Sequence, residues 1–258
     1  PEVVFPALHG SPGEDGTVQG LLEMLGLPYV GSGVRGSALA MDKAVAKSVF
    51  RSHNLPVSMD RIVSSNADLG SVIAQIEENF GSQVAIKPLS AGSALGVQLL
   101  PTGGDLYAAL CDSLQFGDCL VEPFIAGKEI TVGVLHTPQK LQAHPVIEIR
   151  TAADQWYDYE NRYTPGQSEH IVPADLAPSV TAELQHIAVT AHVALGLRDL
   201  SRADFILDKD NNITLLEVNT LPGMTPTSLY PDGAAALGLD FDALIDLLVR
   251  TALTRSTI

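Results

Sequence analysis

The fold is decided by the stretch SRADFILDKDNNITLLEVN at residues 201–219. Two apolar runs flank a turn-forming segment of Asp and Asn, a pattern that predicts a β-hairpin. Strand side chains alternate between faces, so Arg202 and Asp204 share one face of the first strand, and Glu217 and Asn219 share one face of the second. If the hairpin is symmetric about residues 210 and 211, Asp204 lies opposite Glu217 and Arg202 opposite Asn219. The sequence therefore predicts four polar side chains that converge on one surface.

This surface has the chemistry of a metal site. Two carboxylates directly across a sheet repel one another, and a bound cation is the simplest way to keep both ionised. Asp204, Glu217 and the amide oxygen of Asn219 are hard oxygen donors, which suit magnesium or manganese and leave positions for phosphate oxygens. The alternative is a solvent-facing strand whose charges bind nothing, since polar alternation is common on half-exposed sheets. The turn that follows favours the metal site, because a rigid Pro222-Gly223 pair can present backbone N–H groups to an oxyanion.

Strand and helix patterns alternate in the N-terminal part of the chain and become mixed towards the C-terminus. We expect a strand over Glu2–Leu8, a glycine-rich loop over His9–Gly16, a helix over Thr17–Leu25 and one long helix over Ser37–Ser52. The pattern predicts an α/β and α+β fold in three units, 1–36, 37–118 and 119–258. Further expected elements are strands near 28–30, 60–64, 83–87, 97–100, 119–124, 129–135 and 141–150, and helices near 68–80, 104–115, 178–195 and 241–253.

Two segments without regular periodicity are candidates for ligand contact. Ser90–Gly96 is a small-residue loop, which can approach a ligand closely. Ala152–Pro173 is polar, aromatic and long for a connection, which is typical of an active-site lid.

Composition excludes several classes of partner. The formal net charge of -15 argues against a nucleic acid or an acidic membrane, since phosphate backbones require clustered Lys and Arg. The two cysteines, Cys111 and Cys119, form neither a zinc pattern nor a disulfide framework. We find no apolar run of transmembrane length and no signal-peptide pattern, so we expect a cytoplasmic protein.

Two ordered motifs resemble the signatures of the D-alanine–D-alanine ligase family. One is the His9–Gly16 loop, and the other combines Arg202-Ala203-Asp204 with the run from Glu217 to Gly223. Shorter segments fall in the family's order at residues 41–43, 86–88, 121–124 and 157–159. The resemblance implies an ATP-grasp fold whose N-terminal α/β domain is truncated, because family members begin with a further strand-helix-strand segment.

The resemblance also implies which residues bind ATP and metal. Lys43, Lys87 and Arg162, the last in place of the family's lysine, would neutralise phosphate charge. Glu122 would accept a hydrogen bond from the adenine amino group, Glu129 would hold the ribose, and backbone groups of Pro123, Phe124 and Ile125 would complete the adenine slot. Asp204, Glu217 and Asn219 would hold two magnesium ions.

A further set of residues would contact the amino-acid substrates. Ser93 matches a serine of the phosphate-covering loop, whereas Ala94 replaces a second serine. Tyr163 favours an amine as the acceptor, Arg202 and the Gly223 N–H would stabilise the oxyanion, and Ser228 and Leu229 would meet the second D-alanine. His9 would lie near the first D-alanine or be a buried structural histidine.

The implied reaction begins with attack of a D-alanine carboxylate on the ATP γ-phosphate. The resulting acyl phosphate is attacked by the amine of a second D-alanine, which gives D-alanyl-D-alanine for peptidoglycan precursors. The family also implies a homodimer.

Three alternatives remain at this point. One is an ATP-grasp ligase for other amino acids, which would differ at Tyr163, Ser228 and Leu229. A second is a binding fragment that holds ATP but turns over poorly. The third is a dinucleotide-binding fold suggested by the GxGxxG pattern at Gly31–Gly36, which leaves the hairpin unexplained, so we interpret these glycines as a linker turn.

Overall fold

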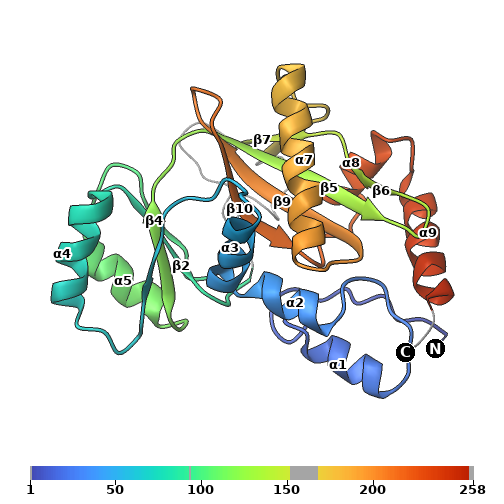
Figure 1. Cartoon of the computed structure of the whole chain (residues 1–258), viewed down its shortest axis with the longest axis horizontal. Coiled ribbons are helices and arrows are strands. Elements are labelled where there is room, and N and C mark those ends of the chain that lie inside the picture. The colour runs from blue at the N-terminus through green and yellow to red at the C-terminus, as the bar shows by residue number, and fades with distance from the viewer. Residues whose placement is uncertain (1, 93, 152–167, 256–258) are drawn as a thin grey trace.

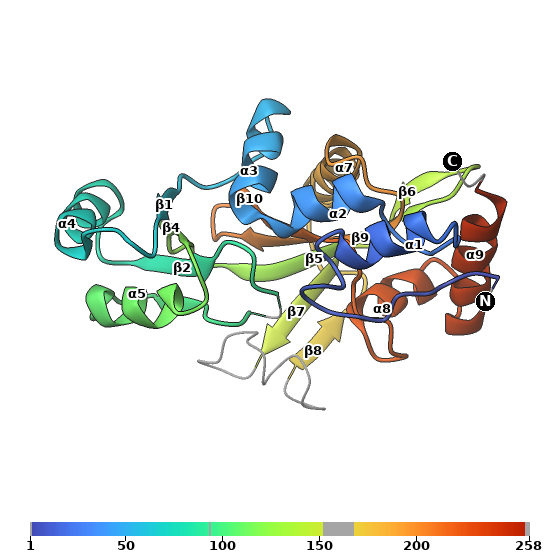
Figure 2. The same cartoon turned by 90° about the horizontal axis from the view of Figure 1, so that it is seen from below.

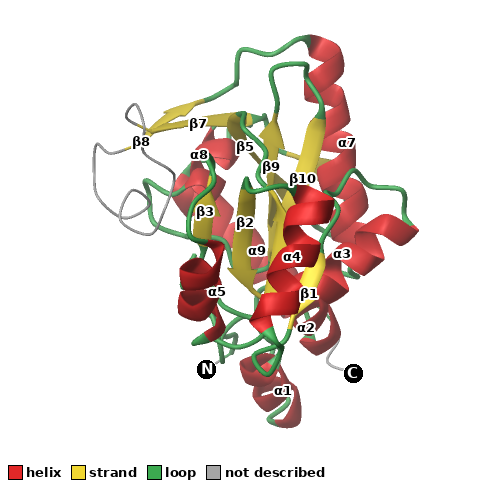
Figure 3. Ribbon diagram, turned by 90° about the vertical axis from the view of Figure 1, so that its left-hand side faces the viewer, coloured by secondary structure: helices red, strands yellow, loops and turns green. Residues whose placement is uncertain are grey.

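The computed structural model describes residues 2–92, 94–151 and 168–255. The predicted site residues Ser93, Arg162 and Tyr163, and most of the predicted lid, lie outside these residues. Within them two sheets form the framework, and Figure 3 shows their strands in yellow and the helices in red.

The smaller sheet has four antiparallel strands in the order β1 (Arg61–Val63), β4 (Cys119–Pro123), β2 (Val84–Pro88), β3 (Gln98–Leu100). Helices α4 (Leu69–Phe80) and α5 (Leu106–Leu114) pack on it at the left of Figure 1. Alternation along the strands divides its side chains: Val84 and Ile86 join the core under the helices, whereas Lys87 and Glu122 line a cavity on the other side. This sheet therefore presents one polar wall. It includes β4, which the sequence had grouped with the C-terminal unit.

The larger sheet has six strands. The order is β10 (Ile213–Asn219), β9 (Asp199–Leu207), β5 (Lys128–His136), β7 (Ile147–Thr151), β8 (Ser168–Ile171), and β6 (Leu141–Ala143) pairs with β5. Helices α3 (Lys43–Ser52) and α7 (Pro178–Ala194) bury their apolar faces on one side of it. Helices α8 (Leu229–Ala235) and α9 (Phe241–Thr254) form a second core with Leu135 and Leu200, and Figure 2 shows α7 and α8 on opposite sides of the sheet.

The N-terminal part corrects two expectations. The predicted strand Glu2–Leu8 is wrong: only Val4 pairs there, in a parallel bridge to Tyr29, and α1 (Thr17–Met24) follows the loop as predicted. The single helix Ser37–Ser52 is also wrong, because α2 (Val34–Met41) and α3 are separate. Asp42 has an extended backbone between them, and its side chain accepts the Ala44 and Val45 N–H groups at 3.0 Å, which caps α3.

The glycines of the GxGxxG pattern are used in packing. Gly31 has φ +103 and donates its N–H to Asp199 at 2.7 Å. A Cβ on Gly36 would lie 2.9 Å from Leu197, so α2 packs against the segment before β9 only without a side chain there. No helix among the described residues is long and apolar enough to cross a membrane.

Candidate nucleotide and metal site

A cavity of about 390 Å³ lies between the two sheets. Its walls combine α3 with strands of both sheets, so residues far apart in the sequence share one space. Most of the predicted ATP and metal residues line it: Lys43, Lys87, Glu122, Pro123, Phe124, Ile125, Glu129, Asp204, Glu217 and Asn219.

Lys87 and Glu122 form the polar wall of the smaller sheet. Lys87 Nζ lies 2.6 Å from Glu122 Oε2, and Lys47 and Ser58 contact the other carboxylate oxygen. Burial alone would raise the pKa of Glu122, but the ammonium groups of Lys87 and Lys47 outweigh it and hold this pKa at about 2. Burial also acts to lower the pKa of Lys87, but Glu122 and Glu217 outweigh it and raise that pKa. Both groups are therefore charged at neutral pH.

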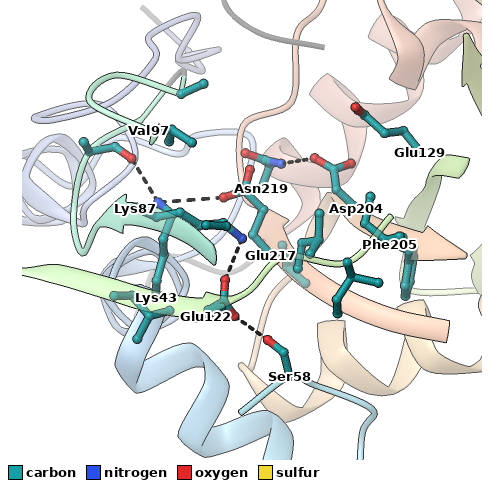
Figure 4. A pocket seen from close by; sticks show the side chains of 18 of the residues that line it. Lys43, Ser58, Lys87, Val97, Glu122, Glu129, Asp204, Phe205, Glu217 and Asn219 are labelled. Carbon is teal, nitrogen blue, oxygen red and sulfur yellow. Dashed lines mark hydrogen bonds and ion pairs between the residues drawn. The ribbon is translucent and has the colours of Figure 1, made fainter. Parts of the chain in front are cut away.

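Lys43 begins α3 and points into the same space (Figure 4). Its Nζ donates to the Ala91 carbonyl at 3.0 Å and lies 3.8 Å from Glu217 Oε2. The helix therefore places one cation beside the loop at residues 90–96 and opposite the hairpin.

The hairpin brings its acids together as the sequence predicts. Glu217 is the cross-strand partner of Asp204, and Asn219 is that of Arg202. The register is not uniform, however: Leu215 pairs with Phe205, and a β-bulge at Leu216 shifts the pairing by one residue before Glu217. Without this bulge the turn would place Leu216, not Glu217, opposite Asp204.

Asp204 is held in a fixed orientation. Arg202 donates to it through two nitrogens, at 2.8 Å to Oδ1 and 2.7 Å to Oδ2, and the Thr131 hydroxyl donates to Oδ1 at 2.6 Å. The Asn219 amide donates to Oδ2 at 3.0 Å, so its oxygen is directed away from this bond. Several donors thus position one acid beside the cavity.

These residues fit a magnesium ion by their chemistry. Two carboxylates in register and one amide supply hard oxygen donors on a single wall, which Figure 4 shows facing the lysines. Among the described residues no group of three or more His, Cys, Asp or Glu side chains is arranged to hold a metal. Asp204, Glu217 and Asn219 are the residues that would hold a bound magnesium ion.

Comparison with known proteins identifies the family of this chain. The family description "D-ala D-ala ligase C-terminus" matches residues 49–250, and "D-ala D-ala ligase N-terminus" matches residues 1–32. The D-alanine–D-alanine ligase of Desulfotalea psychrophila is 44% identical over 99% of this chain and 79% of its own length. That of Acidiphilium cryptum is also 44% identical, over 99% of this chain and 81% of its own length. The chain belongs to the D-alanine–D-alanine ligase family.

Solved structures give the same fold for the ligase. The Bacillus anthracis D-alanine–D-alanine ligase complexed with ATP has a TM-score of 0.83 and 30% identity, covering 98% of this chain and 79% of that one. The D-Ala:D-Ser ligase of Enterococcus faecalis has a TM-score of 0.86 and 33% identity, covering 97% and 73%. The predicted ATP-grasp fold is confirmed, and the chain is shorter than these relatives.

The predicted substrate residues that the structure describes lie outside the cavity lining: His9, Arg202, Gly223, Ser228 and Leu229. His9 is exposed, which corrects the alternative of a buried structural histidine. Gly223 lies beside Ser228, whose Oγ would be 2.9 Å from a Cβ added at Gly223. Leu229 packs with Ile147 and Ile149 in an apolar cluster. The ligase thus groups Gly223 and Ser228 and uses the Leu229 side chain in packing.

Sequence reasoning missed Glu14, Ser58 and Lys47. Glu14 lines the cavity, accepts the Gly10 N–H at 2.6 Å, and has a pKa that burial raises. Its place in the family's His9–Gly16 loop was a usable signal. Lys47 follows Lys43 by four residues on α3, a spacing that puts both on one helix face. Nothing in the sequence around Ser58 marks it as a contact of Glu122.

Proposed function

We propose that the cavity binds ATP with magnesium and that the chain uses it to join two D-alanines into D-alanyl-D-alanine for peptidoglycan synthesis. The observation that carries this proposal is that lysines and paired acids face each other across the cavity. Lys43 and Lys87 lie on one side of the cavity, and the paired acids Asp204 and Glu217 lie on the other. A polyphosphate requires cations, and its bound metal requires oxygen ligands.

The residues divide this work between them. Lys43 and Lys87 would neutralise the phosphates, and the Pro123–Ile125 segment with Glu122 and Glu129 would bind adenine and ribose. Asp204, Glu217 and Asn219 would hold magnesium, which when bound offsets charge on the transferring phosphoryl group. Ser93, Arg162 and Tyr163 belong to the proposal by family resemblance.

The chemical steps then follow from the substrates. A D-alanine carboxylate attacks the γ-phosphate to give an acyl phosphate and ADP, and the amine of the second D-alanine displaces phosphate from that carbonyl. Arg202 and the Gly223 N–H would stabilise the oxyanion, with His9 near the first D-alanine and Ser228 and Leu229 near the second. We extend the proposal to a cytoplasmic homodimer on the same resemblance.

Release of ADP by the purified chain tests this proposal. We expect magnesium-dependent release that D-alanine stimulates, and D-alanyl-D-alanine as the product. A panel of L- and D-amino acids that includes D-serine would show whether another acceptor is preferred. ATP binding without D-alanine-stimulated ADP release would contradict the enzymatic half and favour a binding protein. Gel filtration would test the dimer.

A further inference from the structure

Lys47 is a buried lysine that the reaction outlined above does not use. It is 1% exposed and does not line the cavity. Its Nζ contacts Glu122 Oε1, donates to Ser58 Oγ at 2.9 Å and lies 3.3 Å from Asp60 Oδ1. A buried ammonium needs partners for its N–H donors, and Lys47 has two hydrogen bonds, to Glu122 and Ser58, and an ion pair with Asp60. Lys47 is therefore fixed in place by its surroundings.

The two oxygens of Glu122 have different partners. Oε1 accepts from Lys47 and, at 2.5 Å, from Ser58, so both of its lone pairs are used. Oε2 faces Lys87 at 2.6 Å. A carboxylate oxygen can accept two hydrogen bonds, and Glu122 lines the cavity. Oε2 can therefore accept a second hydrogen bond from a group in the cavity.

The two lysines that hold Glu122 differ in what they face. Lys87 lines the cavity, where a phosphate would compete with Glu122 for its ammonium group. Lys47 is outside the cavity and has only protein groups around it among the described residues. If a phosphate drew Lys87 away from Glu122, Lys47 would still pair with Glu122 Oε1.

We propose that Lys47 is a positioning residue for base selection: by occupying Oε1 it keeps Oε2 of Glu122 directed at the cavity, as an acceptor for the exocyclic amino group of adenine. This inference rests on the proposed ATP site. It predicts that Lys47 affects recognition of the base and not of the triphosphate. Inosine triphosphate is a suitable probe, since it carries a carbonyl where adenine carries the amino group.

The test is calorimetric binding of ATP and inosine triphosphate, with magnesium and without D-alanine, to the full chain. We expect the wild type to prefer ATP by at least about 10-fold, the size of one hydrogen bond to a charged group. Lys47→Met should weaken ATP binding by about 10-fold and inosine triphosphate binding much less, so that the preference disappears. Arg51→Met is the matched control, because Arg51 lies one turn further along α3 and pairs with Asp60 outside the cavity. It should keep the wild-type preference.

The outcomes separate this inference from the ATP site itself. A folded Lys47→Met that keeps the wild-type preference, or loses both nucleotides equally, overturns the positioning role. If this variant does not fold, Lys47→Gln replaces it, since glutamine keeps a polar group at the buried position but removes the ammonium group from Oε1, and an unchanged preference there overturns the proposal. A wild type that binds neither nucleotide contradicts the proposed function, whereas one that binds both equally contradicts only the base selection.

Discussion

Lys43 and Glu217 face each other across the cavity, with Nζ 3.8 Å from Oε2. Lys87 is likewise paired with Glu122. Both lysines assigned to the phosphates are thus already partnered by carboxylates assigned to the metal and the base. A nucleotide with its metal would replace these internal pairs, because it brings both anionic oxygens and a cation. The cavity therefore already contains cationic and anionic side chains to pair with a ligand that carries charges of both signs.

Neutralising either lysine should weaken nucleotide binding. We expect Lys43→Met and Lys87→Met each to raise the Kd for ATP by about 10-fold or more, the size of a charge-assisted hydrogen bond. Calorimetry at two salt concentrations checks this, and the salt dependence should become shallower. Lys128→Met is the control, because Lys128 pairs with Glu148 and does not line the cavity. Wild-type affinity in both cavity variants would remove the phosphate assignment.

Removing charge from the hairpin acids should abolish metal-dependent turnover. Asp204→Asn and Glu217→Gln keep the side-chain size but lose a hard anionic ligand, so we expect ADP release to fall by roughly 100-fold or more at saturating magnesium. Asp210→Asn, in the exposed turn of the same hairpin, should leave the rate unchanged. A rate within a few fold of wild type in either acid variant would discredit the metal site.

Two glycines that meet near the cavity should respond differently to alanine. A Cβ on Gly92 would lie 3.0 Å from Gly10 Cα, so Gly92→Ala forces the two loops apart and should raise the KM for ATP or D-alanine several-fold. Gly10 has open space but φ +67, so Gly10→Ala should instead lower the free energy of unfolding by about 1 kcal/mol. Steady-state kinetics and chemical denaturation distinguish these effects, and unchanged KM values in Gly92→Ala would contradict the loop contact.

Two buried histidines should make stability depend on pH. Burial lowers the pKa of His144 to about 4, and burial together with His136 lowers that of His192 to about 3. The unfolded chain, with a pKa near 6.5, binds more protons below that pH, so stability is lost as pH falls. We expect a loss of about 2 kcal/mol per histidine between pH 6.5 and pH 5.

Denaturation of His144→Phe at the two pH values tests this pH dependence. The variant should lose about 2 kcal/mol less than wild type on acidification. His186→Phe, at an exposed position of α7, should keep the wild-type dependence. If the free energy of unfolding changed equally with pH in wild type and His144→Phe, His144 would not be the titrating group.

Local patterns predicted the long elements and the acids of the hairpin. Helix α7 follows from apolar periodicity, and strand alternation places Asp204 and Glu217 among the polar positions of the hairpin, whereas their direct pairing depends on the bulge at Leu216. Helix α8 could not be found this way, since it contains Pro231 and Gly233 and depends on the buried Tyr230, whose hydroxyl donates to the Val134 carbonyl at 3.0 Å. Tertiary packing outweighs propensity there.

The other errors each have an identifiable physical cause. The break at Asp42 was signalled by a capping residue inside an apparently continuous helix. Glu2–Leu8 has the composition of a strand, but a strand is defined by its partners, and only Val4 has one. The contact of Lys47 with Glu122 joins residues that are 75 positions apart in the sequence, so no local pattern could predict it.

The extra residue at Leu216 has a consequence for how the hairpin can vary. Leu216 is the additional residue of β10, and both it and Glu217 line the cavity. Strand β10 thus contributes an apolar residue and an acid at consecutive positions. The one-residue shift in pairing arises inside the strand and not in the loop at residues 208–212. A change in the length of that loop would therefore leave Glu217 opposite Asp204 as long as the bulge at Leu216 is retained.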